Sequence, residues 1–256
     1  REATEEDVEV IRWGLNNEGN AALLTYMDEQ GLDLRRDKLE FEIYEPKGGS
    51  GKAGIGINSR CETSVGGLYA AGDVIGGVTR AVAPGAFTLG WHAGEVAACA
   101  ARERDPACLD EANEQTVAER RDLCRAILSR SRGAPWKEGQ AALQSLMDYY
   151  VGRVRSATML GAGLVRLARL HREAPAELAA SGPHELQRCL EVLSLVDAGE
   201  AVARSARFRE ESRFGPEHYR ADFPYTDNEN WFCNTAQRRQ DGDVRVYKKP
   251  IRHIYR

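Results

Sequence analysis

Four segments with helical spacing of apolar residues follow Pro106, and they constrain the fold of this chain most strongly. They carry leucines and isoleucines three or four residues apart, and they are separated by the helix-breaking runs Gly133-Ala134-Pro135 and Gly182-Pro183. The predicted helices span about residues 111–130, 136–155, 157–174 and 183–207. Short connections between amphipathic helices are typical of bundles, so this spacing predicts a helical bundle domain over residues 111–207.

The region before Pro106 is rich in glycine and predicts a different kind of structure. Of the 25 glycines, a dense group lies between Gly48 and Gly94, where the backbone must turn tightly or approach a ligand closely. The expected elements are a half-buried strand at Leu39–Tyr44, a short strand at Gly54–Asn58, a buried strand at Gly67–Ala71 and a helix from about Ala86 to Arg104.

The two ends of the chain complete the predicted organisation. Residues 5–30 have near-helical spacing and predict one helix or a kinked pair, ended by Gly31. The last fifty residues are aromatic, charged and irregular, with an edge strand expected at Val244–Ile251. The fold class is therefore α/β plus all-α, with predicted parts at residues 1–110, 111–207 and 208–256.

Composition excludes several classes of protein. The 256 residues are 42% hydrophobic and 29% charged, as in globular proteins, and no apolar run is long enough to span a membrane. The net charge is −4, while residues 201–256 hold 12 Lys and Arg against 8 Asp and Glu. That mixture favours a salt-bridged docking surface over nucleic-acid binding. The first residue is Arg1 rather than Met, so we expect the protein to start upstream.

Cysteine and histidine positions predict neither a metal site nor a disulfide framework. The six cysteines are scattered without a C-x-x-C pair, and the five histidines have no metal-ligand spacing. A chain of this size folds without disulfides. We therefore expect reduced thiols in a cytoplasmic protein.

Two possible nucleotide-binding motifs are excluded by the residues in or next to them. Gly49–Gly54 matches G-x-G-x-x-G, but Ile55-Gly56-Ile57 continues as strand where a dinucleotide fingerprint needs a helix. A P-loop fails because Pro46 replaces its first glycine and Ala53 follows Lys52. No G-x-S-x-G elbow supports a hydrolase.

Residues 59–98 carry the most informative pattern. A buried strand is expected to end at Gly72-Asp73, a glycine-rich loop passes through Arg80, and a helix is expected to open near Gly85-Ala86. An acid at the end of a strand can accept hydrogen bonds from sugar or polyol hydroxyls, and a helix N-terminus offers free N–H groups and partial positive charge. Asp73 could equally cap the turn that follows it.

At these residues the chain resembles the FAD-dependent fumarate reductase/succinate dehydrogenase flavoprotein family, which includes L-aspartate oxidase and the adenylylsulfate reductase alpha subunit. Residues 63–74, TSVGGLYAAGDV, are similar to the flavin-binding C-terminal element of the family. Residues 210–233, EESRFGPEHYRADFPYTDNENWFC, independently resemble its E-S-R-G-x-H-x-R-x-D-F-P tail. The resemblance covers nearly the whole chain and implies the C-terminal half of a longer flavoprotein.

The resemblance implies roles for individual residues. Gly72 and Asp73 match the flavin-binding turn, with Asp73 holding the ribityl chain, and Gly85, Ala86 and Phe87 match the helix start against the isoalloxazine. Arg80 falls where succinate dehydrogenases place an arginine for the substrate carboxylate. A guanidinium suits a small anionic substrate because it binds carboxylate or sulfate through two bonds. Arg80 could instead neutralise an acid near the flavin.

The tail and the substrate are less closely specified by the resemblance. Arg213, His218, Arg220 and Asp222 match family positions expected to be structural. His92 is expected to pack or to support neighbouring residues of the site rather than to act as a catalytic base. The N-S-L that follows the family arginine is absent, and the spacing from Arg80 to Gly85 is closer to the adenylylsulfate reductase branch. No histidine precedes His92 to act on a dicarboxylate.

The implied activity is hydride transfer between a substrate and FAD, with the N-terminal half of the flavoprotein and an iron–sulfur electron-transfer subunit as partners. We expect no nucleic acid, no metal and no membrane span in this chain. The alternative is a non-catalytic assembly module derived from the family.

Overall fold

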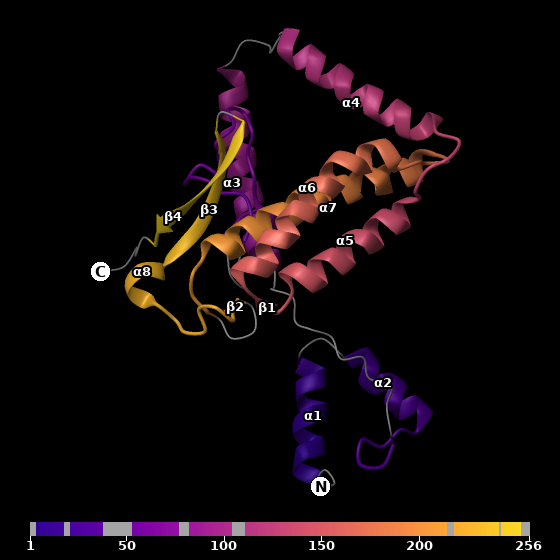
Figure 1. Ribbon diagram of the computed structural model, residues 1–256. Helices are drawn as coiled ribbons and strands as arrows, with labels where there is room; N and C mark the ends of the chain where they lie inside the picture. The colour runs from indigo at the N-terminus through magenta and orange to yellow at the C-terminus, as the bar shows by residue number, and fades with distance from the viewer. Residues whose placement is uncertain are drawn as a thin grey trace. The chain divides into compact units, whose positions relative to one another are not determined.

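The computed structural model describes residues 4–17, 21–37, 53–76, 82–103, 111–213, 218–240 and 242–251 (Figure 1). The chain separates into two compact units, Arg1–Pro46 and Lys47–Arg256. Helices predominate in both units. The strand expected at Leu39–Tyr44 lies outside the described residues.

The first unit contains two helices, α1 (Glu5–Asn17) and α2 (Ala21–Gln30), so the predicted kinked pair is confirmed. Asp7 N–H donates to Thr4 Oγ1 at 3.2 Å and Thr4 N–H donates to the Asp7 carboxylate at 2.8 Å, which is a reciprocal cap. Gly31 ends α2 with φ +65°, and the Leu32 N–H bonds to the Met27 carbonyl at 2.9 Å. Arg12 joins the two helices through Asp28 at 2.7 Å.

The segment 53–76 makes short backbone pairings instead of full strands. Ile55 pairs in parallel with Ile75, and Glu62 pairs antiparallel with Tyr69. The prediction of a buried strand at Gly67–Ala71 is wrong, because only Ala70 in it is buried and Leu68 is 50% exposed. Gly67 (φ +82°) and Gly72 (φ +76°) bound this segment. Two left-handed residues five positions apart leave no room for a regular strand.

The 3₁₀ turn η1 (Gly72–Val74) and the long helix α3 (Val82–Arg102) follow. The helix begins earlier than the predicted start at Gly85-Ala86. Pro84 therefore lies in its first turn, where proline is tolerated because its missing N–H would have no partner.

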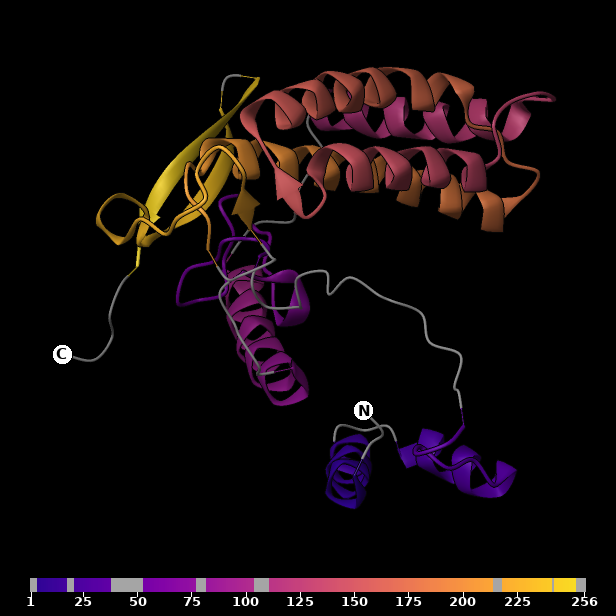
Figure 2. The same cartoon turned by 60° about the horizontal axis from the view of Figure 1, so that its bottom comes forward.

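Helices α4 (Glu111–Ser129), α5 (Trp136–Val151), α6 (Ala157–Glu177) and α7 (Pro183–Phe208) confirm the predicted bundle. Figures 1 and 2 both show α5, α6 and α7 side by side. Ser156 caps α6 by accepting from the Met159 N–H at 3.3 Å. Pro183 is the first residue of α7, where its fixed φ suits a helix start.

The bundle core consists of two clusters of buried side chains. One contains Leu143, Val151, Leu160, Leu167, Val196, Ala203 and Ala206; the other contains Ile127, Ala174, Leu178, Ala180, Cys189 and Val192. Glycines permit the closest helix contacts. A Cβ at Gly163 of α6 would lie 2.7 Å from Tyr150 Cβ, and one at Gly199 of α7 would lie 3.0 Å from Met147 Sδ.

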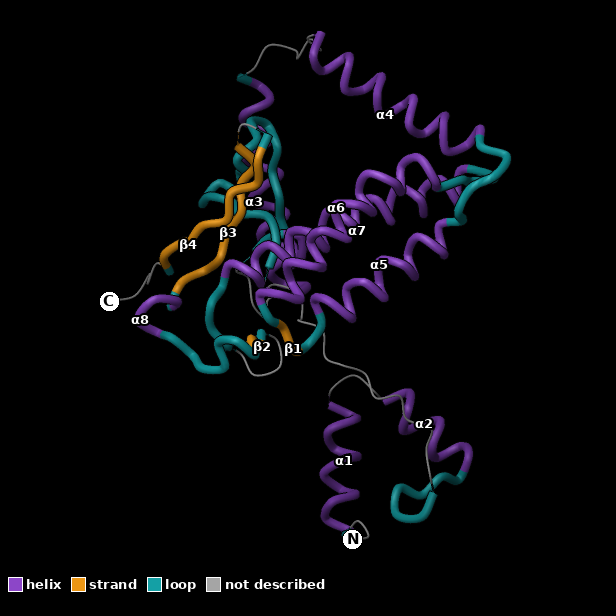
Figure 3. The backbone as a smooth tube through the Cα atoms, viewed as in Figure 1, coloured by secondary structure: helices purple, strands orange, loops and turns teal. Residues whose placement is uncertain are grey.

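The tail is more ordered than the sequence predicts. It contains β2 (Tyr219–Arg220), paired in parallel with β1 (Val154–Arg155), the short helix α8 (Asn228–Trp231) and the antiparallel hairpin of β3 (Cys233–Gln240) and β4 (Asp243–Pro250). Figure 3 shows this hairpin as the longest strand pair in the described chain. The edge strand expected at Val244–Ile251 is confirmed as β4.

Candidate functional site

The turn at Gly72 and the start of α3 contact each other. With φ +76°, Gly72 adopts a conformation that L side chains rarely take, and a Cβ built on it would lie 3.4 Å from Ala86 Cβ. Two residues assigned to the flavin by resemblance, 14 positions apart, are therefore neighbours. Asp73 lies in η1 beside this contact with its side chain exposed.

Backbone hydrogen bonds with Ile55 also hold η1 in place. The Ile55 N–H donates to the Val74 carbonyl at 2.8 Å, and the Gly76 N–H donates to the Ile55 carbonyl at 3.1 Å. A Cβ at Gly54 would lie 2.5 Å from the Val74 oxygen. The last glycine of the G-x-G-x-x-G pattern thus permits two backbone segments to meet, which accounts for it without a nucleotide.

Helix α3 is tied to the preceding loop and leaves a large exposed surface. His92 Nε2 contacts the Ser59 carbonyl at 3.0 Å, and the buried Cys61 thiol approaches the Leu89 carbonyl at 3.9 Å. Phe87 is 81% exposed and Trp91 is 74% exposed. His92 is exposed and its ring contacts a backbone carbonyl, and its role stays a prediction. Arg80 lies outside the described residues.

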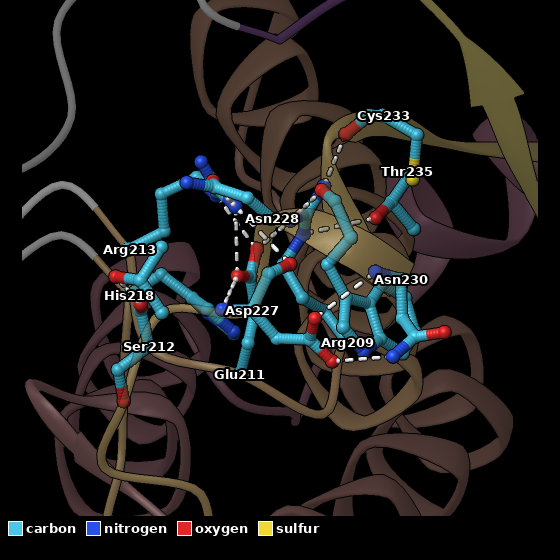
Figure 4. A network of polar contacts seen from close by, with 12 residues as sticks. Arg209, Glu211, Ser212, Arg213, His218, Asp227, Asn228, Asn230, Cys233 and Thr235 are labelled. Carbon is cyan, nitrogen blue, oxygen red and sulfur yellow. Dashed lines mark hydrogen bonds and ion pairs between the residues drawn. The ribbon is translucent and has the colours of Figure 1, made fainter.

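A second polar site lies in the tail, where Glu211 is fully buried (Figure 4). Arg213 donates to both of its carboxylate oxygens at 2.7 and 2.9 Å, Arg209 donates to Oε1, and the Asp227 N–H donates to Oε2 at 2.9 Å. Burial by itself raises the pKa of Glu211, but the bonds from Arg213 and Asp227 outweigh burial and hold the pKa below its usual value.

Arg209 extends this cluster to the hairpin. It donates to the carbonyls of Trp231 and Cys233 and to Thr235 Oγ1 at 3.3 Å. Its guanidinium also lies 5.5 Å from the centre of the Trp231 ring. The same side chain therefore joins the Glu211 loop, α8 and β3.

Arg220 is also fully buried, and its partners close the end of the bundle. It donates to the carbonyls of Ala206, Arg207 and Arg209 at 2.9, 3.1 and 2.8 Å. These carbonyls lie at the C-terminal end of α7. The last carbonyls of a helix have no intrahelical N–H partner and carry partial negative charge, so a cation beside them is favourable. Two bonds from Arg220 also lower the pKa of Asp222 to about 2.

His218 lies beside these arginines in its neutral form. Arg155 Nη1 lies 3.1 Å from its Nδ1, and a guanidinium is a donor only, so Nδ1 accepts and the ring proton is on Nε2. Burial, followed by the charge of Arg155, lowers the pKa of His218 to about 4. The contacts of Arg220 and Asp222 join the tail to α7 and α6. The structural role expected for Arg213, His218, Arg220 and Asp222 stays a prediction.

The sequence assigned roles to four members of this cluster, included Glu211 only as part of the matched E-S-R motif, and missed Arg155 and Arg209. One signal was present: Arg209, Glu211 and Arg213 alternate in an extended segment, so both arginines lie on the face of the glutamate. Nothing local marked Arg155, whose partner His218 is 63 residues away.

Residues 140–254, which include most of the bundle and the whole Glu211 cluster, match the family model for the fumarate reductase flavoprotein C-terminal region. This segment belongs to the fumarate reductase/succinate dehydrogenase flavoprotein family. The resemblance inferred from residues 210–233 is thereby confirmed.

Relatives of this flavoprotein segment extend the match toward the N-terminus. An FAD-dependent oxidoreductase of Methanocaldococcus jannaschii, itself uncharacterized, is 31% identical over 215 residues, which are 80% of this chain and 37% of the relative. The adenylylsulfate reductase alpha subunit of Megalodesulfovibrio gigas is 33% identical over 90 residues, 34% of this chain and 14% of that subunit.

A solved flavoprotein structure has the same fold. Adenylylsulfate reductase from Archaeoglobus fulgidus superimposes with a TM-score of 0.68 at 26% identity, over 76% of this chain and 33% of that one. The chain thus spans about a third of the length of that structure and of the relative from Methanocaldococcus jannaschii. Within the described residues, no helix is long and apolar enough to cross a membrane.

Proposed function

We propose that this chain is the C-terminal part of an FAD-dependent oxidoreductase flavoprotein and completes its flavin site. The observation that carries the proposal is the contact between Gly72 in η1 and Ala86 in the first turns of α3. It joins two segments that the family resemblance assigns to the flavin, in a chain whose C-terminal segment belongs to a flavoprotein family.

The residues of this turn fit a flavin. The exposed Asp73 carboxylate would accept hydrogen bonds from ribityl hydroxyls, and the first turn of α3 would present backbone N–H groups and partial positive charge to the ring. Gly85 and Ala86 keep that turn free of bulk, and the exposed Phe87 offers an apolar surface. FAD, when bound, supplies a two-electron centre that exchanges hydride with the substrate.

The substrate proposed is a small anion held by Arg80, through the two-bond geometry that guanidinium offers carboxylate or sulfate. The similarity to adenylylsulfate reductases of two organisms supports a sulfur oxyanion compound over a dicarboxylate. An iron–sulfur subunit as electron acceptor and a cytoplasmic location complete the proposal.

Reconstitution tests the flavin site. This chain would be co-expressed with the N-terminal part that its relatives possess, and the purified complex examined for the visible absorption of FAD. We expect bound flavin with the unaltered chain, and about tenfold weaker FAD binding with Asp73→Ala. Asp122→Ala, on the exposed side of α4, is the matched control and should bind like the unaltered chain. A folded complex without flavin would contradict the proposal.

Substrate assays then separate the chemistries. With ferricyanide present to take up the two electrons released per turnover, adenylylsulfate formation from sulfite and AMP is expected to proceed, and succinate oxidation is expected to be absent. Arg80→Lys keeps the charge but loses the planar fork, so we expect it to raise KM for the anion more than it lowers kcat.

A non-catalytic assembly module is the second candidate. It is favoured by the contacts of the buried Glu211, which tie Arg213, Arg209 and Asp227 together, and by the bonds of Arg209 to α8 and β3, an arrangement that serves assembly of the tail. Unchanged flavin affinity and turnover in the Asp73→Ala complex would support this candidate.

A further inference from the structure

The β3–β4 hairpin has two unlike faces, set by its register. Residues directly opposite each other share a face, and Gln237 lies opposite Val246 while Arg238 lies opposite Arg245. Gln237 donates to the Ala201 carbonyl and to Ser205 Oγ at 2.6 Å, both in α7. The face of Gln237 is therefore the one that packs on the bundle.

Further contacts on the packed face fix the hairpin in place. Thr235 accepts from Arg209 at 3.3 Å, and Lys248 lies opposite Thr235 with its ammonium 3.7 Å from the centre of the Trp231 ring. The Lys248 ammonium also donates to the Asn230 carbonyl at 2.9 Å. Lys248 on the packed face is thus used within the fold, whereas Arg239, the other cation on this face, is exposed.

The cations on the opposite face of the hairpin are exposed and pair with no described carboxylate. Arg238, Arg245 and Lys249 all point away from α7 by the alternation of the strands, and all are exposed. The ion pairs of the described tail involve Arg209, Arg213 and Arg220. No described carboxylate pairs with Arg238, Arg245 or Lys249.

The pairing of Arg238 with Arg245 is unfavourable for the isolated hairpin, because like charges directly opposite each other repel. Tyr247 is the next residue on this face and is 43% exposed. Two arginines beside an exposed tyrosine have the composition of a protein interface, in which Arg and Tyr are enriched. An approaching carboxylate would remove the repulsion.

We propose that this outward face, defined by Arg238, Arg245, Tyr247 and Lys249, binds an acidic segment of a partner polypeptide. Charge complementarity specifies the occupant. Three cations are too few for a nucleic-acid site, which neutralises many phosphates, and fewer than the basic clusters that bind anionic lipid. Asp243 is exposed on the same face, two residues from Arg245, so the acidic segment is expected to contact the Arg245 and Lys249 end of the face.

Binding of a labelled oligoglutamate peptide to the full chain, followed by fluorescence anisotropy, tests the proposal. We expect binding that weakens as salt is raised, and a loss of about tenfold or more in affinity for the triple variant Arg238→Gln, Arg245→Gln, Lys249→Gln. The matched control removes three positive charges from α4 through Arg120→Gln, Arg121→Gln and Arg125→Gln, and should change affinity by less than about twofold.

Two further measurements test whether the charge, and not a loss of folding, explains the change in affinity. Arg238→Lys with Arg245→Lys keeps the charge and should retain the salt-dependent binding. Thermal unfolding of the triple variant should match or exceed that of the unaltered chain, because the substitutions remove a repulsion from an exposed face.

Several outcomes would overturn the proposal. These are no binding of the peptide, equal losses in the hairpin and α4 triple variants, or tighter binding of single-stranded DNA or of phosphatidylglycerol vesicles than of the peptide. The first would leave the cations as charges that keep an edge hairpin from pairing with other chains.

Discussion

Arg220 and Asp222 form a two-bond ion pair, at 2.8 and 2.7 Å, in which the arginine is fully buried and the aspartate side chain is 30% exposed. Asp222 also accepts from the N–H of Ala157, the first residue of α6, at 2.8 Å. The pair therefore joins the tail to the start of α6, while the other bonds of Arg220 reach the end of α7.

Removing the anion of this pair should destabilise the fold. Asp222→Asn preserves the shape of the side chain but leaves the buried Arg220 without a counter-charge, so we expect a loss of about 2–4 kcal/mol in the free energy of unfolding. Urea denaturation followed by circular dichroism measures it. Asp122→Asn, whose ion pair with Arg125 is exposed on both sides, should change stability by less than about 0.5 kcal/mol.

His218 should make stability depend on mildly acidic pH. Its pKa is lowered from 6.5 to about 4 in the folded chain, so between these values the unfolded chain binds a proton that the folded chain does not. Stability is therefore fully present above about pH 6.5 and falls as pH drops toward about 4. His218→Gln should flatten this part of a Tm-against-pH profile. His184→Gln, at the exposed start of α7, should keep the slope, and an unchanged slope in His218→Gln would contradict the assignment.

Two glycines of α6 should respond oppositely to alanine. A Cβ at Gly163 would lie 2.7 Å from Tyr150 Cβ, so Gly163→Ala should cost about 1–3 kcal/mol through overpacking. A Cβ at Gly161 would approach only Arg207 Cζ, at 4.0 Å, so Gly161→Ala should gain about 0.5–1 kcal/mol from helix propensity. Thermal unfolding of the two variants checks the sign, and equal effects would argue against the α5–α6 contact.

Gly72 should be intolerant of a side chain for a reason of backbone conformation. Gly72→Ala forces a left-handed alanine against Ala86 and should cost about 1–2 kcal/mol locally. Faster amide hydrogen exchange in the peptides covering residues 53–76 and the first turns of α3 would report the loss. Gly90→Ala, in the interior of α3 where a Cβ meets nothing within 4 Å, should leave exchange in residues 53–76 unchanged.

Most helices were predictable because their causes are local. The apolar spacing, Ser156 as a cap and Pro183 at a first turn specify α5 to α7 within a few residues of their observed ends. The start of α3 was placed at Gly85-Ala86, later than its observed start at Val82, although Pro84 is compatible with the first turn of a helix.

β3 was not predicted because CNTAQRRQ lacks the apolar alternation of a strand. It is a strand because β4 pairs with it and because Gln237 reaches α7. The Asp241-Gly242 dipeptide between them was the available hairpin signal, and Gly242 has φ +84°.

The candidate flavin site was also predicted only in part from the sequence. Residues 63–74 and the glycine at position 72 identified the turn from sequence alone, since a short motif and a residue type suffice. That Ala86 meets Gly72, and that Gly54 meets Val74, followed only from the folded chain.

The sequence by itself determined the helices, the glycine turns and the family of this protein, because spacing, capping and short motifs act over a few residues. Only the tertiary structure decided the Glu211 and Arg220 clusters and the charged face of the hairpin. Their bonds join residues far apart in the chain, such as Arg155 and His218. Because Glu211 and Arg220 are buried, they need partners within the fold, and no local pattern in the sequence specifies which residues these are.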